Sequence, residues 1–296
     1  MNIDRYLAES KGSVDQALDR LLPPETEEPA TIHRAMRYSV FAGGKRVRPI
    51  LVLAAGESVG GARETLLHLG CAVEMLHTYS LIHDDLPALD NDDLRRGVPT
   101  CHKVFGEAMA ILAGDALLTR CYQLLGELPS VPGGDATRLA LVRELARATG
   151  TTNGMIGGQV VDLESEGKPI GAATLEYIHR SKTGALLSAC TRTGGLASGA
   201  SARQMEALDH YGRNVGLMFQ IVDDILDVTG NSADLGKTAG KDQKVKKATY
   251  PALYGLEASR EKARALSLAA IRAVEPLGEA AAPLRSLAQF IHTRTT

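Results

Sequence analysis

The chain of 296 residues contains 44% hydrophobic and 23% charged residues, ample apolar material for a large core in a globular protein. Its formal net charge of −2 argues against a nucleic-acid partner, because nucleic acids favour a basic binding surface. Only 4% of the residues are aromatic and Trp is absent, a composition that favours helices over strands.

Nothing near the amino terminus predicts export or membrane insertion. The first residues, Met-Asn-Ile-Asp-Arg-Tyr, are polar and lack the apolar run of a signal peptide. The best candidate span, residues 108–118, falls short of the ~20 apolar residues that a membrane requires and contains Asp115. The four cysteines form no CxxC pair, so we expect neither a zinc site nor a disulfide framework. These features predict a cytoplasmic protein without a membrane span.

Apolar residues recur at three- and four-residue spacing through most of the chain, which is typical of amphipathic helices. The first such stripe consists of Leu7, Val14, Leu18 and Leu21. Residues 23–29, rich in Pro and acidic residues, are predicted to connect it to a second helix over residues 30–42. That helix should end at Gly43-Gly44, and Pro49 can lie in the first turn of the next one.

Longer periodic segments follow. Helices are predicted over residues 64–83, 107–128, 137–149, 175–197 and 202–228, with two more near the carboxyl terminus. Residues 129–134 and 230–249 are expected to be loops, and no segment has a convincing strand alternation. No break in composition separates two domains. The sequence therefore predicts a single all-α domain over residues 1–296.

Two acidic clusters follow apolar helical runs. The first is Asp84-Asp85-Leu-Pro-Ala-Leu-Asp90-Asn-Asp92-Asp93, and the second is Asp223-Asp224-Ile-Leu-Asp227. Both lie near predicted helix carboxyl ends, where the helix dipole and neighbouring like charges disfavour carboxylates. Either cluster alone would fit a solvated face, but the placement of both favours bound cations. Oxygen ligands without His or Cys suit a hard ion such as Mg²⁺.

Basic residues accompany both clusters and predict a phosphate-bearing ligand. The segments are Gly43-Gly44-Lys45-Arg46-Val47-Arg48-Pro49, Arg95-Arg96-Gly97, Lys182-Thr183-Gly184, Gly236-Lys237 and the Lys-rich residues 241–247. Any one of them alone would be an ordinary surface charge, but their repeated adjacency to acidic or Gly-marked breaks favours diphosphate binding. His77 lies seven residues before Asp84, on nearly the same helix face, so substrate contact is favoured there over a boundary role.

These residues resemble a known family. Residues 80–97 (Ser-Leu-Ile-His-Asp-Asp-Leu-Pro-Ala-Leu-Asp-Asn-Asp-Asp-Leu-Arg-Arg-Gly) and 219–227 (Phe-Gln-Ile-Val-Asp-Asp-Ile-Leu-Asp) are similar to the two aspartate-rich motifs of trans-prenyltransferases. Residues 42–49, 157–159, 179–184 and 247–251 match the family in the same order. The resemblance covers residues 30–255 and is strongest to bacterial farnesyl diphosphate synthases, with plant-type geranylgeranyl diphosphate synthases next.

The resemblance implies an all-α bundle around a deep central cavity, usually in a homodimer, with about three Mg²⁺ ions. By motif match, Asp84 and Asp90 hold two ions, Asp223 holds a third, and Asp85 and Asp227 support them. The matched allylic-substrate contacts are Arg95, Lys182, Thr183, Gln220 and Lys237. The matched contacts to isopentenyl diphosphate are Lys45, Arg48, His77 and Arg96, and Lys247 completes the substrate-binding set. The catalytic set comprises Asp84, Asp90, Arg95, Lys182, Asp223 and Lys237.

The implied reaction condenses isopentenyl diphosphate with dimethylallyl and then geranyl diphosphate to give farnesyl diphosphate. In the family, residues five and four positions before the first Asp, here Tyr79 and Ser80, form part of the cavity floor. A bulky Tyr79 should stop growth at fifteen carbons, although it could instead be a packed boundary residue. The chain ends His292-Thr-Arg-Thr-Thr296, without the basic terminal residue often seen in the family.

Three alternatives differ in class or product. A geranylgeranyl diphosphate synthase would extend the chain to twenty carbons. A terpene cyclase normally carries Asn, Ser and Glu in its second metal motif and needs no second diphosphate site. A non-catalytic prenyltransferase subunit tends to lose the acidic motifs, whereas this chain keeps both.

Overall fold

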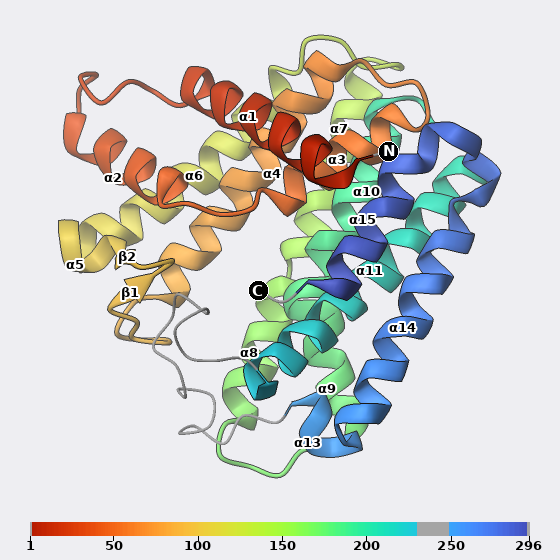
Figure 1. Ribbon diagram of the computed structural model, residues 1–296. Coiled ribbons are helices and arrows are strands. Elements are labelled where there is room, and N and C mark those ends of the chain that lie inside the picture. The colour runs from red at the N-terminus through yellow and green to blue at the C-terminus, as the bar shows by residue number, and fades with distance from the viewer. Residues whose placement is uncertain (1, 230–248, 295–296) are drawn as a thin grey trace.

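The computed structural model describes residues 2–229 and 249–294, and nearly all of their regular structure is helical (Figure 1). The first helices are α1 (Ile3–Leu21), α2 (Ala30–Phe41), α3 (Val47–Glu57), α4 (Arg63–Asp84), α5 (Cys101–Phe105), α6 (Glu107–Gly126), α7 (Asp135–Thr149) and α8 (Met155–Ser165). They are followed by α9 (Ala172–Ile178), η1 (His179–Gly184), α10 (Ala185–Ala197), α11 (Ala202–Thr229), α13 (Tyr250–Tyr254), α14 (Leu256–Ala273), η2 (Glu275–Ala281) and α15 (Ala282–Thr293). The all-α prediction is confirmed.

Several elements differ from the prediction. Helices α5 and α8 form where no helix was predicted, and two further regions also differ. The helix predicted over residues 175–197 is divided into α9, the π-helical segment η1 and α10. A short antiparallel hairpin, β1 (Leu94–Arg95) and β2 (Val98–Pro99), lies where no strand was predicted. Its turn residues Arg96 and Gly97 both have positive φ, 54° and 81°, as in the tight turns that match the twist of paired strands. Strands of two residues are too short for alternation to reveal them.

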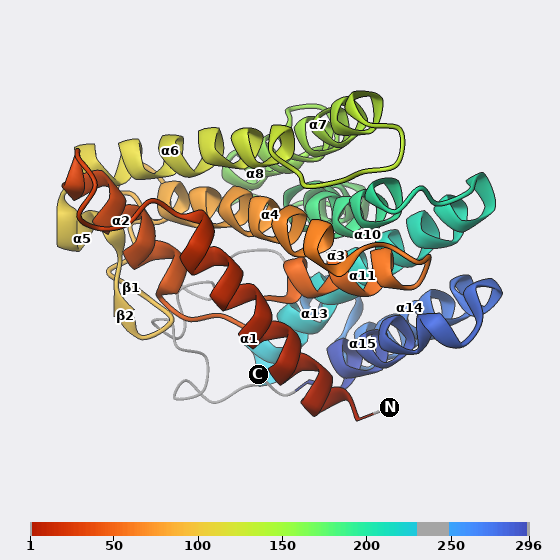
Figure 2. The same cartoon turned by 90° about the horizontal axis from the view of Figure 1, so that it is seen from above.

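The core lies around α3, which is buried from residue 49 to residue 56. Within these residues the side chains are apolar on every side, as expected of a helix enclosed by others. Helices α4 and α10 pack against α3, and α4 also packs against α1 and α6. Figure 2 shows α4 between α6 on one side and α1 on the other. None of the helices in the described ranges combines the length and hydropathy of a membrane span.

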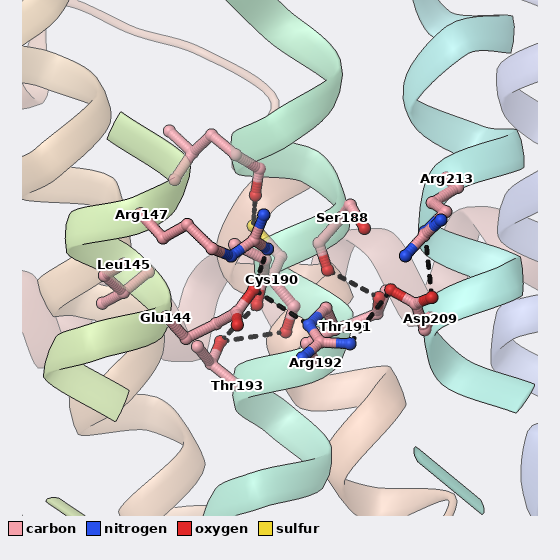
Figure 3. Close-up of polar contacts among 12 residues, drawn as sticks. Glu144, Leu145, Arg147, Ser188, Cys190, Thr191, Arg192, Thr193, Asp209 and Arg213 are labelled. Atoms are coloured by element: carbon pink, nitrogen blue, oxygen red, sulfur yellow. Dashed lines mark hydrogen bonds and ion pairs between the residues drawn. The ribbon is translucent and has the colours of Figure 1, made fainter. Parts of the chain in front are cut away.

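A chain of ion pairs joins α7, α10 and α11 (Figure 3). On α10, Arg192 donates from Nε to Glu144 Oε1 (2.9 Å) and from Nη1 to Asp209 Oδ1 (3.0 Å). Arg147 extends the chain at Glu144 (2.6 Å), and Arg213 extends it at Asp209 (2.9 Å). Because Glu144 is buried, the two guanidinium groups compensate a carboxylate that would otherwise be costly there. The network fixes α7, α10 and α11 relative to one another.

A second polar contact joins the amino-terminal helices at Arg46, which precedes α3. Its guanidinium donates to Asp15 Oδ1 on α1, to Glu74 Oε1 on α4 and to the Val40 carbonyl on α2, each at 2.8 Å. The side chains of Arg46 and Glu74 are only 2% and 3% exposed. Arg46 therefore ties four helices together and is a structural residue, although it lies within a segment predicted to read phosphate.

We predict that Arg46→Ala lowers the free energy of unfolding by about 3–5 kcal/mol, because it leaves the Glu74 carboxylate buried without its partner. Urea denaturation followed by circular dichroism measures the change. The matched control is Lys45→Ala, which removes an exposed cation one residue earlier and should cost about 0.5 kcal/mol or less. Equal losses in the two variants would contradict the structural role of Arg46.

Candidate active site

The two acidic clusters lie at the carboxyl ends of α4 and α11. Helix α4 ends at Asp84 with Asp85 as its C-cap residue, and α11 ends two residues after Asp227. Burial is the main cause that raises the pKa of Asp84 to about 6, while the Lys182 ammonium opposes the shift. Because Lys182 belongs to η1, this charge interaction brings the end of α4 and η1 to the same site.

The loop after α4 folds back onto the end of the helix. The backbone amide of Asp90 donates to the carbonyl of Asp84 (2.8 Å), and the amide of Asp92 donates to the carbonyl of Asp85 (3.2 Å). These bonds satisfy carbonyls that have no partner inside the helix. They also bring the backbone of Asp90 and Asp92 close to that of Asp84, despite the four residues that separate Asp85 from Asp90.

Asp85 and Arg95 form a buried ion pair between α4 and β1. Arg95 Nε donates to Asp85 Oδ1 (3.0 Å), Nη2 also donates to that oxygen, and a longer contact reaches Asp92 Oδ2 (3.6 Å). Burial raises the pKa of Asp85, and the hydrogen bonds from Arg95 oppose the rise. Asp85 thus contacts a cation supplied by the hairpin, while Asp84 is more exposed than its neighbour.

His77 and Arg48, which the sequence assigns to one substrate-binding set, lie together between α4 and α3. Arg48 Nη1 lies 3.1 Å from His77 Nε2. Burial lowers the pKa of His77 well below its ordinary value, and the nearby Arg48 and Arg96 charges lower it further. His77 is therefore neutral and accepts a hydrogen bond from Arg48, which leaves the other guanidinium nitrogens available for an anion.

Arg96 crosses the Gly43-Gly44 turn, which explains both glycines. Its Nη1 donates to the carbonyl of Gly43, and a Cβ built on Gly44 would lie 2.4 Å from the same nitrogen. Gly44 also has φ +117°, a backbone conformation that other residues rarely adopt. Gly44 therefore makes room for a guanidinium, and both glycines follow the end of α2.

Lys182 projects from a closely packed π-helical segment. Its backbone lies so near α8 that a Cβ on Gly158 would be 2.2 Å from the Lys182 amide nitrogen. Its Nζ donates to Asp162 Oδ2 on α8 at 2.7 Å. Asp162 is buried, and the sequence prediction missed it. The sequence did contain a signal for Asp162. It lies three residues after Gln159, on the same helix face as the Gly-Gly-Gln segment that matches the family.

Tyr79 lies in the contact between α4 and α6. It is 7% exposed, and burial with the nearby Tyr122 raises the pKa of its hydroxyl to about 12. Its ring meets that of His83 edge to face, with centroids 5.8 Å apart. Ser80, by contrast, donates its hydroxyl hydrogen to the carbonyl of His77 (2.8 Å), within its own helix.

The remaining predicted residues lie in several places. Thr183 on η1 and Gln220 on α11 are half-buried, and Asp227 is exposed near the end of α11. Lys237 and Lys247 lie outside the described residues.

Arg294, just after α15, is the second residue that sequence reasoning missed. Its Nη2 donates to Asp223 Oδ1 and to the carbonyl of Phe219 (3.2 Å), and the guanidinium lies 4.0 Å from the Phe219 ring centroid. Lys45 belongs to the same region, because burial and then Arg294 lower its pKa while Asp223 raises it. The end of the chain therefore supplies a cation to the second acidic cluster, although the terminal residue itself is not basic.

The donor chemistry of this site suits Mg²⁺. Carboxylates from α4 and α11 supply hard oxygen ligands, and the raised pKa of Asp84 reflects a charge that a divalent cation would stabilise. Over the described ranges, no three His, Cys, Asp or Glu side chains are already gathered as a ready-made ligand group. That arrangement is compatible with Mg²⁺, which usually takes one or two carboxylates and completes its shell with water and substrate phosphate.

Comparison with known proteins identifies relatives over almost the whole chain. Residues 29–281 match the family model described as polyprenyl synthetase. The chain is 50% identical to a farnesyl diphosphate synthase of Geobacillus stearothermophilus over 262 residues, 88% of each chain. It is 46% identical to a farnesyl diphosphate synthase of Escherichia coli over 298 residues, 99% of each chain. The apo crystal structure of a synthase from Zymomonas mobilis, titled FPP/GFPP synthase, superposes with a TM-score of 0.87 at 37% identity, covering 99% of both chains.

We predict that Asp84→Asn stabilises the metal-free protein at neutral pH. The pKa of Asp84 is about 6 in the folded protein, against an ordinary value of 3.8. Between these two values the folded protein binds more protons than the unfolded chain does, so the free energy of unfolding falls as pH rises through this range. This loss of stability is complete once the Asp84 carboxyl is ionised, above about pH 6. The uncharged Asn variant should therefore have a free energy of unfolding about 1–3 kcal/mol higher than the parent at pH 7 in EDTA. Urea unfolding at several pH values measures the gain, which should vanish toward pH 4.

The control for this prediction is Asp93→Asn, which alters a 71% exposed carboxylate in the same loop and should give no comparable gain. A gain for Asp84→Asn that is the same at pH 4 and pH 7 would show that it does not arise from the ionisation of Asp84.

Proposed function

The chain belongs to the polyprenyl synthetase family, and we propose that it synthesises farnesyl diphosphate from isopentenyl diphosphate and dimethylallyl or geranyl diphosphate. The observation that carries the proposal is the convergence of Asp84, Lys182 and Asp223 with the Arg48–His77 pair in one region of the fold. The names of the Geobacillus stearothermophilus and Escherichia coli relatives support farnesyl diphosphate as the product.

The acidic side of the site is proposed to bind magnesium, about three ions in all. Asp84 and Asp90 would hold two of them, Asp223 a third, and Asp227 would act in support. The ion pair with Arg95 favours a supporting role for Asp85 as well. When bound, Mg²⁺ neutralises negative charge that develops on a leaving diphosphate.

The basic residues would divide between the two substrates. Arg95 and Lys182, with Thr183, Gln220 and Lys237, would bind the allylic diphosphate. Heterolysis of its allylic carbon–oxygen bond leaves the electron pair on this diphosphate, and fixed cations stabilise that charge without reorganising.

Lys45, Arg48, His77 and Arg96 would bind isopentenyl diphosphate, with Lys247 completing the set. The alkene of this substrate supplies the electron pair of the new carbon–carbon bond. The proton then lost can pass to the released diphosphate, so no protein base is required.

A direct assay tests the proposal. The purified protein is incubated with Mg²⁺, isopentenyl diphosphate and geranyl diphosphate, and the dephosphorylated alcohols are identified by mass. We expect a fifteen-carbon alcohol that disappears when EDTA replaces Mg²⁺. A twenty-carbon alcohol would favour the geranylgeranyl alternative, a cyclic hydrocarbon formed without isopentenyl diphosphate would favour a cyclase, and no product would favour a non-catalytic subunit.

We also propose that the protein is a homodimer, joined through the outer layer formed by α6, α7 and α8 (Figure 2). This layer exposes large apolar side chains at Ile111, Leu112, Leu139, Ile156, Val160 and Leu163. On α8, Ile156, Val160 and Leu163 are spaced as one helix face. Gathered apolar side chains of this kind mark protein–protein contacts.

We predict that Leu112→Glu shifts the protein from dimer to monomer, because a carboxylate would be buried in the interface without a partner. Size-exclusion chromatography with light scattering measures the mass. The control is Leu268→Glu, at a similarly exposed position on α14, which should leave the mass unchanged. A monomeric parent, or an equal effect of both variants, would contradict the proposed interface.

We propose that Tyr79 limits the length of the product. Removing its ring should open apolar space between α4 and α6, which a longer prenyl tail would fill at ~25 cal/mol per Å² buried. Tyr79→Ala should therefore release twenty-carbon or longer products, although truncation of a buried aromatic costs on the order of 3–5 kcal/mol of stability. Mass analysis of the alcohols measures product length.

The control is Tyr79→Phe, which keeps the ring and should keep the fifteen-carbon product. If Tyr79→Ala is folded and active but still stops at fifteen carbons, another residue limits the chain.

A further inference from the structure

Asp224 belongs to the second acidic cluster, but it points in a different direction from its neighbour. Adjacent residues on an α-helix are about 100° apart around the axis. The Asp223 side chain is 37% exposed and meets Arg294, whereas Asp224 as a residue is only 7% exposed. Of these two neighbouring carboxylates, Asp223 therefore lies on the open side of α11 and Asp224 is buried within the protein.

The buried carboxylate of Asp224 holds two other segments through one oxygen. Its Oδ2 accepts a hydrogen bond from the backbone amide of Tyr250 (2.7 Å) and lies 3.3 Å from His179 Nε2. The His179 and Tyr250 rings stack over each other with centroids 6.2 Å apart and an angle of 21°. Asp224 thus joins α11 to the first residue of η1 and to the first residue of α13.

The segment that Asp224 holds is the one that carries Lys182 and Thr183. A π-helix is an uncommon and intrinsically weaker arrangement that often marks a functional site, so η1 depends on contacts from outside. Gly216 of α11 packs against its far end, where a Cβ would lie 2.8 Å from the Cα of Gly184. His179 fixes its near end to the same helix through Asp224, so both ends of η1 are set by α11.

From this arrangement we propose that Asp224 is a positioning residue rather than a metal ligand. Its carboxylate holds η1 so that Lys182 and Thr183 face the end of α4. Binding a metal would require the carboxylate to leave its buried position, breaking the contact with His179 and leaving the amide of Tyr250 without its acceptor. The inference rests on the proposed prenyl transfer for its kinetic consequences, but its structural consequences can be measured without turnover.

The experiment compares Asp224→Ala, Asp224→Asn and His179→Phe with Asp223→Ala. Asp224→Asn is the conservative variant, because one amide oxygen can keep both contacts that Oδ2 now makes, the hydrogen bond from the Tyr250 amide and the approach to His179 Nε2. His179→Phe keeps an aromatic ring beside Tyr250 but removes the ring nitrogen that contacts Asp224.

The structural readouts are hydrogen exchange in residues 179–184 and calorimetric binding of Mg²⁺ with inorganic diphosphate. Asp224→Ala and His179→Phe should accelerate exchange in this segment about tenfold or more, and Asp224→Asn should not. Asp223→Ala should weaken binding of Mg²⁺ with diphosphate about tenfold, whereas Asp224→Asn should change it by about twofold or less.

The kinetic readout separates the two substrates. Asp224→Ala and His179→Phe should raise KM for geranyl diphosphate about tenfold, with a change of about threefold or less in KM for isopentenyl diphosphate. Asp224→Asn should restore the parental values.

Two results would overturn the inference. One is that Asp224→Asn weakens Mg²⁺ binding as much as Asp223→Ala does, which would make Asp224 a metal ligand. The other is unchanged exchange in residues 179–184 when either Asp224 or His179 is replaced. If Asp224→Ala does not fold, Asp224→Asn and His179→Phe still decide between these outcomes. If the parent makes no prenyl product while exchange and binding behave as expected, the proposed function fails but the positioning role stands.

Discussion

Carboxylates gathered at the carboxyl ends of two helices carry an electrostatic cost that the surrounding structure has to offset. The raised pKa of Asp84 expresses that cost, since burial and neighbouring carboxylates disfavour its charged form. Compensation comes from segments distant in sequence: Arg95 from the hairpin, Lys182 from η1 and Arg294 from the end of the chain. The acidic clusters therefore determine which segments converge on the site. They also determine what the site can bind.

Cations can lie this close to the acidic side chains only where neighbouring backbone segments approach closely. Glycine makes that approach possible. Gly44 leaves space for the Arg96 guanidinium, and Gly158 lets α8 lie against the backbone of Lys182. A side chain at either position would force a cation away from the site. The recognised Gly-Gly-Lys-Arg and Gly-Gly-Gln segments are thus explained by packing around the charged residues, in addition to their effect on helix ends.

The sequence predicted most of the long helices and both acidic clusters because apolar periodicity and helix-end signals are local. The local pattern of residues could not separate Arg46 from Arg48, two identical residues two positions apart, because only tertiary burial makes one a structural ion pair and the other a partner of His77. Only the family resemblance placed Arg48, and not Arg46, in the substrate-binding set. The π-helical turn was missed because its residues continue a helical pattern. Arg294 was missed because its contact with Asp223 spans 71 residues and leaves no local signal.

Helix α4 carries both residues to which the proposed control of product length is assigned. Its end carries Asp84, and Tyr79 lies five residues earlier, about 7.5 Å along the axis at the usual helical rise. Because α4 is packed against α3, α1 and α6, this spacing cannot change without disturbing the core. A substrate whose diphosphate is held near Asp84 would therefore have a fixed length available for its tail before it reaches the aromatic ring. If Tyr79 bounds the cavity as proposed, the size of one side chain on a rigid helix would set product length, while the chemistry at the helix end would be left unchanged.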